Sequence, residues 1–174
     1  SENSIIVLES VYEELIKSLE EEGGSLLDIQ EKKILQQGMW SENGIINRDI
    51  IAKKSNEIAT LVGLKGKHLS SKFLMVEEQN VGLDFPFSME KLSPVLAVYK
   101  AKDFGHAVEI ATLILKNQGK GHSCGIHSQN EDNIERLGME LPVCRVIVNQ
   151  AHCFATGGNF DNGLPFSLSM GCGT

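Results

Sequence analysis

The sequence predicts an α/β fold, in which parallel strands alternate with helices. Short apolar runs rich in β-branched residues, such as residues 95–99 and 144–149, are typical of buried strands. Between them lie segments whose apolar residues recur every three to four positions, as in an amphipathic helix. Because strand–helix–strand crossovers join parallel strands, this alternation favours a parallel sheet covered by helices.

In the first half of the chain the apolar residues are spaced less regularly, and this half ends in an irregular stretch at 80–94. The elements expected there are, in order, a strand at 4–9, a helix carrying Val11, Leu15 and Leu19 that ends at Gly23, a helix at 26–39 with Ser25 as its N-cap, a helix at 48–62 and a strand at 73–76.

The second half alternates more cleanly. The elements expected there are a strand at 95–99, a helix from Phe104 capped by Asp103 and ended by Gly119, a strand at 122–127, a helix from Asn130 or Asp132 towards Leu141, a strand at 144–149 and a long Gly- and Asn-rich loop at 154–166.

Composition narrows the class of function. The chain has 174 residues, enough for about one domain, and 16 basic against 23 acidic residues give a net charge of −7. A nucleic-acid binder normally shows a basic face and a membrane anchor a polybasic segment, so neither partner is expected. No apolar run approaches the roughly 20 residues of a membrane span.

The cysteines give no sign of a metal or disulfide framework, because no CxxC pair occurs among Cys124, Cys144, Cys153 and Cys172. Reduced thiols in a cytosolic protein are therefore expected. Cys172, between two glycines, is open to two interpretations: an accessible thiol or a small residue in a tight loop.

The glycine-rich stretch at 119–125 does not have the order of a phosphate-binding loop, because it leaves a helix and enters a strand. Strand alternation would also place His122 and Cys124 on one face and His127 on the other, so no metal site is expected. These residues alone indicate only an α/β domain.

Four motifs together resemble the CoA-acylating aldehyde dehydrogenases, in matching order and spacing over essentially the whole chain. They are EKLSP at 90–94, GKGHS at 119–123, PVCRVIVN at 142–149 and LSMGCGT at 168–174. The resemblance implies the parallel-sheet, three-layer catalytic domain of the aldehyde dehydrogenase fold. Residues 1–174 would be an incomplete catalytic domain, without the nucleotide-binding domain.

The same resemblance implies the chemistry. A cysteine expected two residues upstream of Ser1 would attack an aldehyde, NAD or NADP would take the hydride, and CoA would resolve the thioester. Glu90 matches the glutamate that binds the nicotinamide ribose, or it is a structural loop carboxylate. His122 matches the motif histidine, as a proton donor or acceptor, a CoA-orienting group or a structural hydrogen-bonding residue.

Substrate contacts are expected from Asn159 and Phe160, in the loop that approaches the substrate pocket in this fold. Residues 149–174 are most similar to the branch of the family that acts on sulfoacetaldehyde, and Arg145 is the one nearby cation for a sulfonate, or a structural residue. The family also implies a homo-oligomer in the cytoplasm, free or within a microcompartment. The alternatives are a non-catalytic module of the same fold and a hydrolytic aldehyde dehydrogenase, which the EKLSP and GKGHS motifs disfavour.

Overall fold

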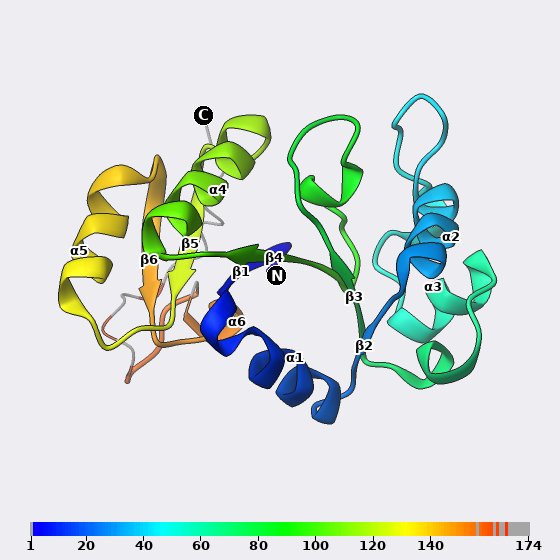
Figure 1. Cartoon of the computed structure of the whole chain (residues 1–174), viewed down its shortest axis with the longest axis horizontal. Helices are drawn as coiled ribbons and strands as arrows, with labels where there is room; N and C mark the ends of the chain where they lie inside the picture. The colour runs from blue at the N-terminus through cyan, green and yellow to red at the C-terminus, as the bar shows by residue number, and fades with distance from the viewer. Residues whose placement is uncertain (1, 156, 162, 164–165, 167–174) are drawn as a thin grey trace. The chain divides into compact units, whose positions relative to one another are not determined.

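The computed structural model describes residues 2–155, 157–161, 163 and 166 (Figure 1). The chain divides into two compact units, and each is described by itself. The N-terminal unit is Asn3–Asp103, and the C-terminal unit is Ser1–Glu2 together with Phe104–Thr174. Leu168–Thr174, which carry one of the four motifs and Cys172, lie outside the described residues.

A four-stranded parallel sheet forms the centre of the N-terminal unit, in the order β1-β4-β3-β2. Its strands are β1 (Ser4–Leu8), β2 (Gly24–Leu26), β3 (Phe73–Glu77) and β4 (Val95–Ala101). Leu74, Met75 and Val76 are all fully buried, as expected of a parallel strand covered on both faces. The strands predicted at 4–9, 73–76 and 95–99 are confirmed, with small changes at their ends.

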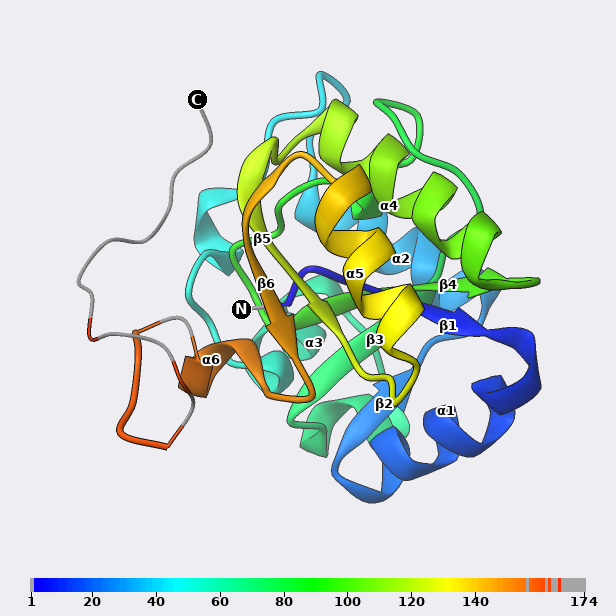
Figure 2. The ribbon, with the colours of Figure 1, turned by 90° about the vertical axis from the view of Figure 1, so that its left-hand side faces the viewer.

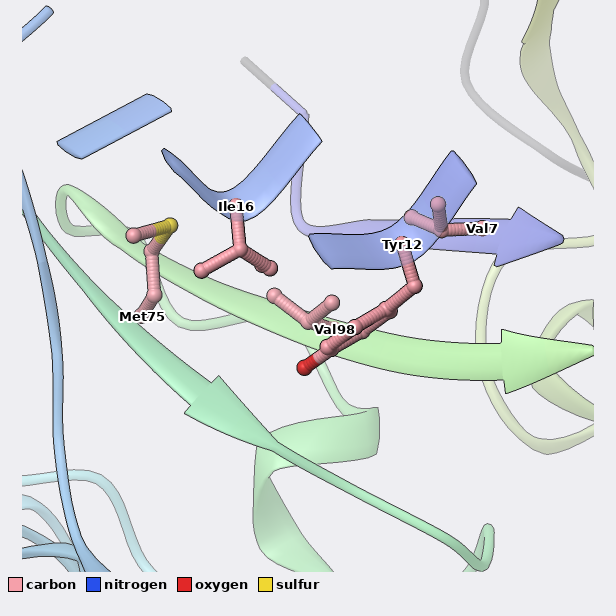
Figure 3. Packing of buried hydrophobic residues seen from close by; sticks show 5 residues of the cluster. All are labelled: Val7, Tyr12, Ile16, Met75 and Val98. Carbon is pink, nitrogen blue, oxygen red and sulfur yellow. The ribbon is translucent and has the colours of Figure 1, made fainter. Parts of the chain in front are cut away.

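Helix α1 (Tyr12–Glu21) covers one face of this sheet, after the short 3₁₀ turn η1 (Glu9–Val11). Tyr12 and Ile16 pack against side chains of three strands, Val7, Met75 and Val98 (Figure 3). The predicted apolar face was therefore partly wrong. Val11 precedes the helix and Leu15 is exposed, while Leu19 joins the edge of this core.

The prediction of a helix at 26–39 was wrong at its start. Residues 24–26 form β2, and α2 (Ile29–Met39) begins after Asp28, whose carboxylate accepts from the N–H groups of Gln30 and Glu31. The Glu31 carboxylate in turn accepts from the Asp28 N–H at 2.9 Å, which completes a capping box. Ser25 is a buried strand residue rather than an N-cap.

The single helix predicted at 48–62 is two elements. The 3₁₀ turn η2 (Arg48–Ile50) ends before Ala52, whose left-handed φ of 58° breaks the helical path. Helix α3 (Ser55–Val62) then begins, and Gly63 ends it with φ 85°. A further 3₁₀ turn, η3 (Gly66–Ser70), leads to β3.

The C-terminal unit alternates as the sequence predicts. It contains α4 (Phe104–Asn117), β5 (Gly121–Ile126), α5 (Glu131–Glu140), β6 (Val143–Val148) and the short α6 (His152–Ala155).

Strands β5 and β6 pair in parallel, and α4 and α5 lie along them (Figure 2). Val108, Leu137 and Leu141 form the core between these helices and strands. Asn130 is the N-cap of α5, accepting from the Asn133 N–H at 3.1 Å. Both units therefore have parallel strands covered by helices, which confirms the α/β class. Across the described residues, every helix is too short or too polar to cross a membrane.

Candidate functional site

Glu90 lies on a loop that crosses from β3 to β4, and short-range hydrogen bonds fold this loop back on itself. The 3₁₀ turn η4 (Pro86–Ser88) ends at Ser88, whose Oγ accepts from the Gly82 N–H at 3.1 Å. The Met89 N–H donates to the Pro86 carbonyl at 3.0 Å. Glu90 follows with its side chain exposed. An exposed carboxylate on an ordered loop can accept hydrogen bonds from a bound polyol.

Lys91, the next residue, is fully buried. Its Nζ donates to the carbonyls of Phe87 at 2.8 Å and Met89 at 2.9 Å. Burial lowers the pKa of the Lys91 ammonium to about 7, although the carboxylates of Glu90 and Glu78 oppose that shift. Sequence reasoning missed this residue, since the composition of the loop gives no sign that its lysine points inward.

The loop is also fixed at two further points. The Lys91 N–H donates to Asn3 Oδ1 at 3.1 Å, and the Asn3 carbonyl accepts from Ala97 in β4 at 3.1 Å. Leu92 has a left-handed φ of 47°, and its carbonyl accepts from the Ala52 N–H at 3.0 Å. A non-glycine residue held in this region costs conformational energy and persists only where the surroundings impose it.

His122 lies in the C-terminal unit, at the start of β5. Gly119 and Gly121 on either side have φ values of 124° and 81°, conformations that glycine adopts at no steric cost. The His122 N–H donates to the Gly119 carbonyl at 3.1 Å, and its side chain is exposed. The predicted helix end and turn are therefore confirmed, and the turn presents an imidazole on the surface of this unit.

Asn159 and Phe160 lie together in the loop after α6. The Asn159 side chain accepts from the Phe160 N–H at 2.7 Å. The Phe160 ring is 89% exposed and packs edge to face on Phe166, with ring centroids 5.0 Å apart. The structure thus places these two beside each other in the C-terminal unit, and Glu90 in the N-terminal unit.

The loop after β6 is tied to the start of the chain within the C-terminal unit. The His152 N–H donates to the Glu2 carboxylate at 3.1 Å, and the His152 ring lies 3.5 Å from the same oxygen. Burial lowers the pKa of His152, and Glu2 opposes that shift. The ring also occupies the space beside Gly125, where a Cβ would lie 2.7 Å from His152 Cε1.

The described cysteines Cys124, Cys144 and Cys153 are free thiols. Burial raises the pKa of the Cys124 thiol. Arg145 is partly buried on β6.

A buried polar network was also missed by sequence reasoning. His68 Nδ1 lies 2.8 Å from Ser25 Oγ, and His68 Nε2 lies 2.8 Å from a Glu31 oxygen. This serine–histidine–glutamate order resembles a hydrolase triad, but Ser25 and His68 are each only 2% exposed. Glu31 is also part of the α2 capping box. The network therefore joins β2, α2 and η3 as a structural element.

A hollow of about 530 Å³ lies at the start of α3, and three lysines, Lys53, Lys54 and Lys72, contribute to its lining. Its walls also include Ser55 and Pro94. Glu90, His122, Asn159 and Phe160 are not among its lining residues. Of the EKLSP motif at 90–94, only Pro94 is a lining residue.

Comparison with known proteins shows which enzymes the chain is similar to. No protein-family model matches it. It is 52% identical, over its whole length, to the acylating sulfoacetaldehyde dehydrogenase of Cupriavidus necator. It is 34% identical, again over its whole length, to the acetylating succinate-semialdehyde dehydrogenase of Clostridium kluyveri. The chain is homologous to a segment of the acylating aldehyde dehydrogenases.

A solved structure agrees with this. The acetylating aldehyde dehydrogenase of Geobacillus thermoglucosidasius superposes on 99% of the chain with a TM-score of 0.88 and 34% identity. The chain spans 35% of the Cupriavidus enzyme, 38% of the Clostridium enzyme and 37% of the Geobacillus chain. It thus covers about a third of the length of these acylating aldehyde dehydrogenases.

Proposed function

We propose that this chain is the incomplete catalytic domain, residues 1–174, of an NAD(P)-dependent, CoA-acylating aldehyde dehydrogenase. The observation that carries the proposal is the 52% identity, along the whole chain, to an acylating sulfoacetaldehyde dehydrogenase. In this proposal a nucleotide-binding domain and a nucleophilic cysteine, two residues before Ser1, belong to the same enzyme. NAD(P), when bound, supplies the hydride acceptor of the reaction.

The geometry around Glu90 fits a nicotinamide ribose. Its carboxylate is exposed, as a group that meets a ligand must be, and the backbone beside it is fixed by Lys91 and by the strained Leu92. Two ribose hydroxyls are donors, and an ionised carboxylate offers two acceptor oxygens. Glu90 would therefore hold the ribose of the bound cofactor.

His122 has the exposure that a proton-transfer or CoA-orienting group needs, at a turn whose backbone the two glycines define. An imidazole can donate or accept a proton at physiological pH. We assign it one of these two roles, and Asn159 and Phe160 a contact with the aldehyde.

For the substrate we propose sulfoacetaldehyde, with CoA as the acyl acceptor, in a homo-oligomer of the cytoplasm. The higher identity to the sulfoacetaldehyde enzyme than to the succinate-semialdehyde enzyme, 52% against 34%, supports the sulfonate. Both substrates carry an anion, and Arg145 is a cation on β6 that can bind either.

The test is an assay of the complete enzyme that carries this chain. NAD(P)H formation is followed with sulfoacetaldehyde and with succinate semialdehyde, each with and without CoA. We expect CoA-dependent NAD(P)H formation and a higher kcat/KM for sulfoacetaldehyde. A preference for succinate semialdehyde would refute the substrate, and absence of aldehyde-dependent NAD(P)H formation would support a non-catalytic module instead.

A further inference from the structure

We propose that Lys91 is a positioning residue for Glu90: its buried Nζ donates to two loop carbonyls that precede Glu90 and so sets the direction of the Glu90 carboxylate. The proposal rests on the function proposed for Glu90. It gives a role to a charged side chain that the chemistry of the reaction does not itself use.

The burial of Lys91 needs an explanation. Lysine is almost never fully buried, because removing an ammonium from water is costly unless other groups replace its hydration. Lys91 is 0% exposed, and the carbonyls of Phe87 and Met89 take the place of water around its Nζ. A methionine of similar length would fill the space without donating to either carbonyl.

The two acceptors lie on the segment that carries Glu90. Met89 immediately precedes Glu90, and Lys91 immediately follows it, so the Nζ–Met89 bond closes a small ring around the Glu90 backbone. Phe87 is fully buried and packs edge to face on Trp40, with ring centroids 5.0 Å apart. The Nζ–Phe87 bond therefore connects this ring to a residue anchored in the core.

A third contact fixes the backbone on the C-terminal side of Glu90. The Lys91 N–H donates to Asn3 Oδ1 at 3.1 Å, just before β1 begins. The backbone on both sides of Glu90 is thus held by groups of Lys91. Catalytic and binding groups need placement within about 0.5 Å, and a misplacement of about 1 Å can cost about a hundredfold. Freeing this loop should therefore weaken the binding that depends on Glu90.

The experiment is a double-mutant cycle in the complete enzyme, with Lys91→Met, Glu90→Gln and the double variant. The readouts are the Kd for NAD(P)+ by calorimetric titration, the KM for NAD(P)+ and for aldehyde, and hydrogen–deuterium exchange of residues 82–94. Lys33→Met, which removes a charge at an exposed site of α2, is the matched control.

We expect Lys91→Met to raise the Kd for NAD(P)+ on the order of tenfold, to leave the aldehyde KM near wild type and to speed exchange at 82–94. Because Lys91 acts through Glu90, we expect the Lys91→Met effect on Kd to vanish in the Glu90→Gln background. An unchanged Kd in Lys91→Met, or an effect that simply adds to that of Glu90→Gln, would overturn the proposal.

A second variant guards against a misfolded Lys91→Met protein. Asn3→Ala keeps the Lys91 Nζ and its two carbonyl acceptors, and removes the acceptor of the Lys91 backbone N–H. We expect a smaller rise in Kd with the same dependence on Glu90, and an additive effect would contradict the proposal. The proposed function and the role of Lys91 can be refuted separately. A wild-type enzyme that forms no NAD(P)H in a CoA-dependent reaction refutes the proposed function. An active wild type in which the effects of Lys91→Met and Glu90→Gln on Kd simply add refutes only the role of Lys91.

Discussion

The two units hold their candidate residues in different ways. In the N-terminal unit, Glu90 projects from a loop whose neighbours are buried and hydrogen-bonded, with Lys91 and Phe87 both fully enclosed. In the C-terminal unit, His122 and Phe160 project from turns and are themselves exposed. The N-terminal unit therefore orders its candidate residue through contacts with buried neighbours, and the C-terminal unit through local turn geometry. Substitutions can test this difference.

The largest effect is expected in the N-terminal core. Leu74 is fully buried in β3, so Leu74→Ala should lower the free energy of unfolding by about 2–5 kcal/mol. Urea denaturation of the purified protein measures this. Leu113→Ala, at an exposed position of α4, is the control and should cost less than about 0.5 kcal/mol. Equal losses at the two positions would contradict the assigned core.

The second-largest effect is expected from Glu90→Gln. Losing hydrogen bonds to a charged acceptor costs about 1.5–3 kcal/mol, so the complete enzyme should use NAD(P) about 10- to 150-fold less well. The aldehyde KM should change little, because Glu90 contacts the cofactor in this account. Steady-state kinetics with NAD(P) and the aldehyde varied in turn separate the effect on the cofactor from the effect on the aldehyde. Unchanged kcat and cofactor KM would remove Glu90 from the site.

The third prediction concerns pH. Folding lowers the pKa of Lys91 from its usual 10.5 to about 7, so between these values the unfolded chain binds more protons than the folded one. This contribution to stability therefore rises with pH, by about 1–3 kcal/mol from about pH 7.5 to about pH 9.5.

Lys91→Met should abolish that rise, and Lys33→Met should keep it. Urea denaturation at several pH values measures the slope. The same slope in wild type and Lys91→Met would show that another group causes it.

The last prediction concerns two helical glycines, and it ends on the smallest effect, that of Gly138→Ala. A Cβ on Gly38 in α2 would lie 2.3 Å from Val62 Cγ1, so Gly38→Ala should destabilise by about 1–3 kcal/mol despite its better helix propensity. A Cβ on Gly138 in α5 meets nothing within 4 Å, so Gly138→Ala should stabilise by about 0.5–1 kcal/mol. Thermal midpoints measure both, and a stabilising Gly38→Ala would disprove close packing of α2 on α3.

Much of the fold could be predicted from the sequence, because the strong signals are local. Apolar runs located β1, β3, β4 and β6, and Asn130, the N-cap of α5, was one of the two expected starting residues. The failures occurred where a local signal competed with a stronger one. The capping box of Asp28 and Glu31 overrode Ser25, and the left-handed Ala52 divided one apolar pattern into two elements.

The site was less predictable. Glu90 and His122 were selected through motifs, and their exposure is consistent with ligand contact. The inward turn of Lys91 depends on how its loop folds around the carbonyls of Phe87 and Met89. The Ser25–His68–Glu31 network joins residues that are far apart in the sequence. A single polar residue carries no periodic signal of its burial, so these groups appear only in three dimensions.

The central claim is that the enzyme carrying this chain passes its acyl group to CoA. The direct measurement is quantitative product analysis by mass spectrometry after oxidation of sulfoacetaldehyde with NAD(P)+ and CoA. We expect one acyl-CoA for each NAD(P)H formed and little turnover when CoA is left out. Free carboxylate as the main product, formed at the same rate without CoA, would contradict it.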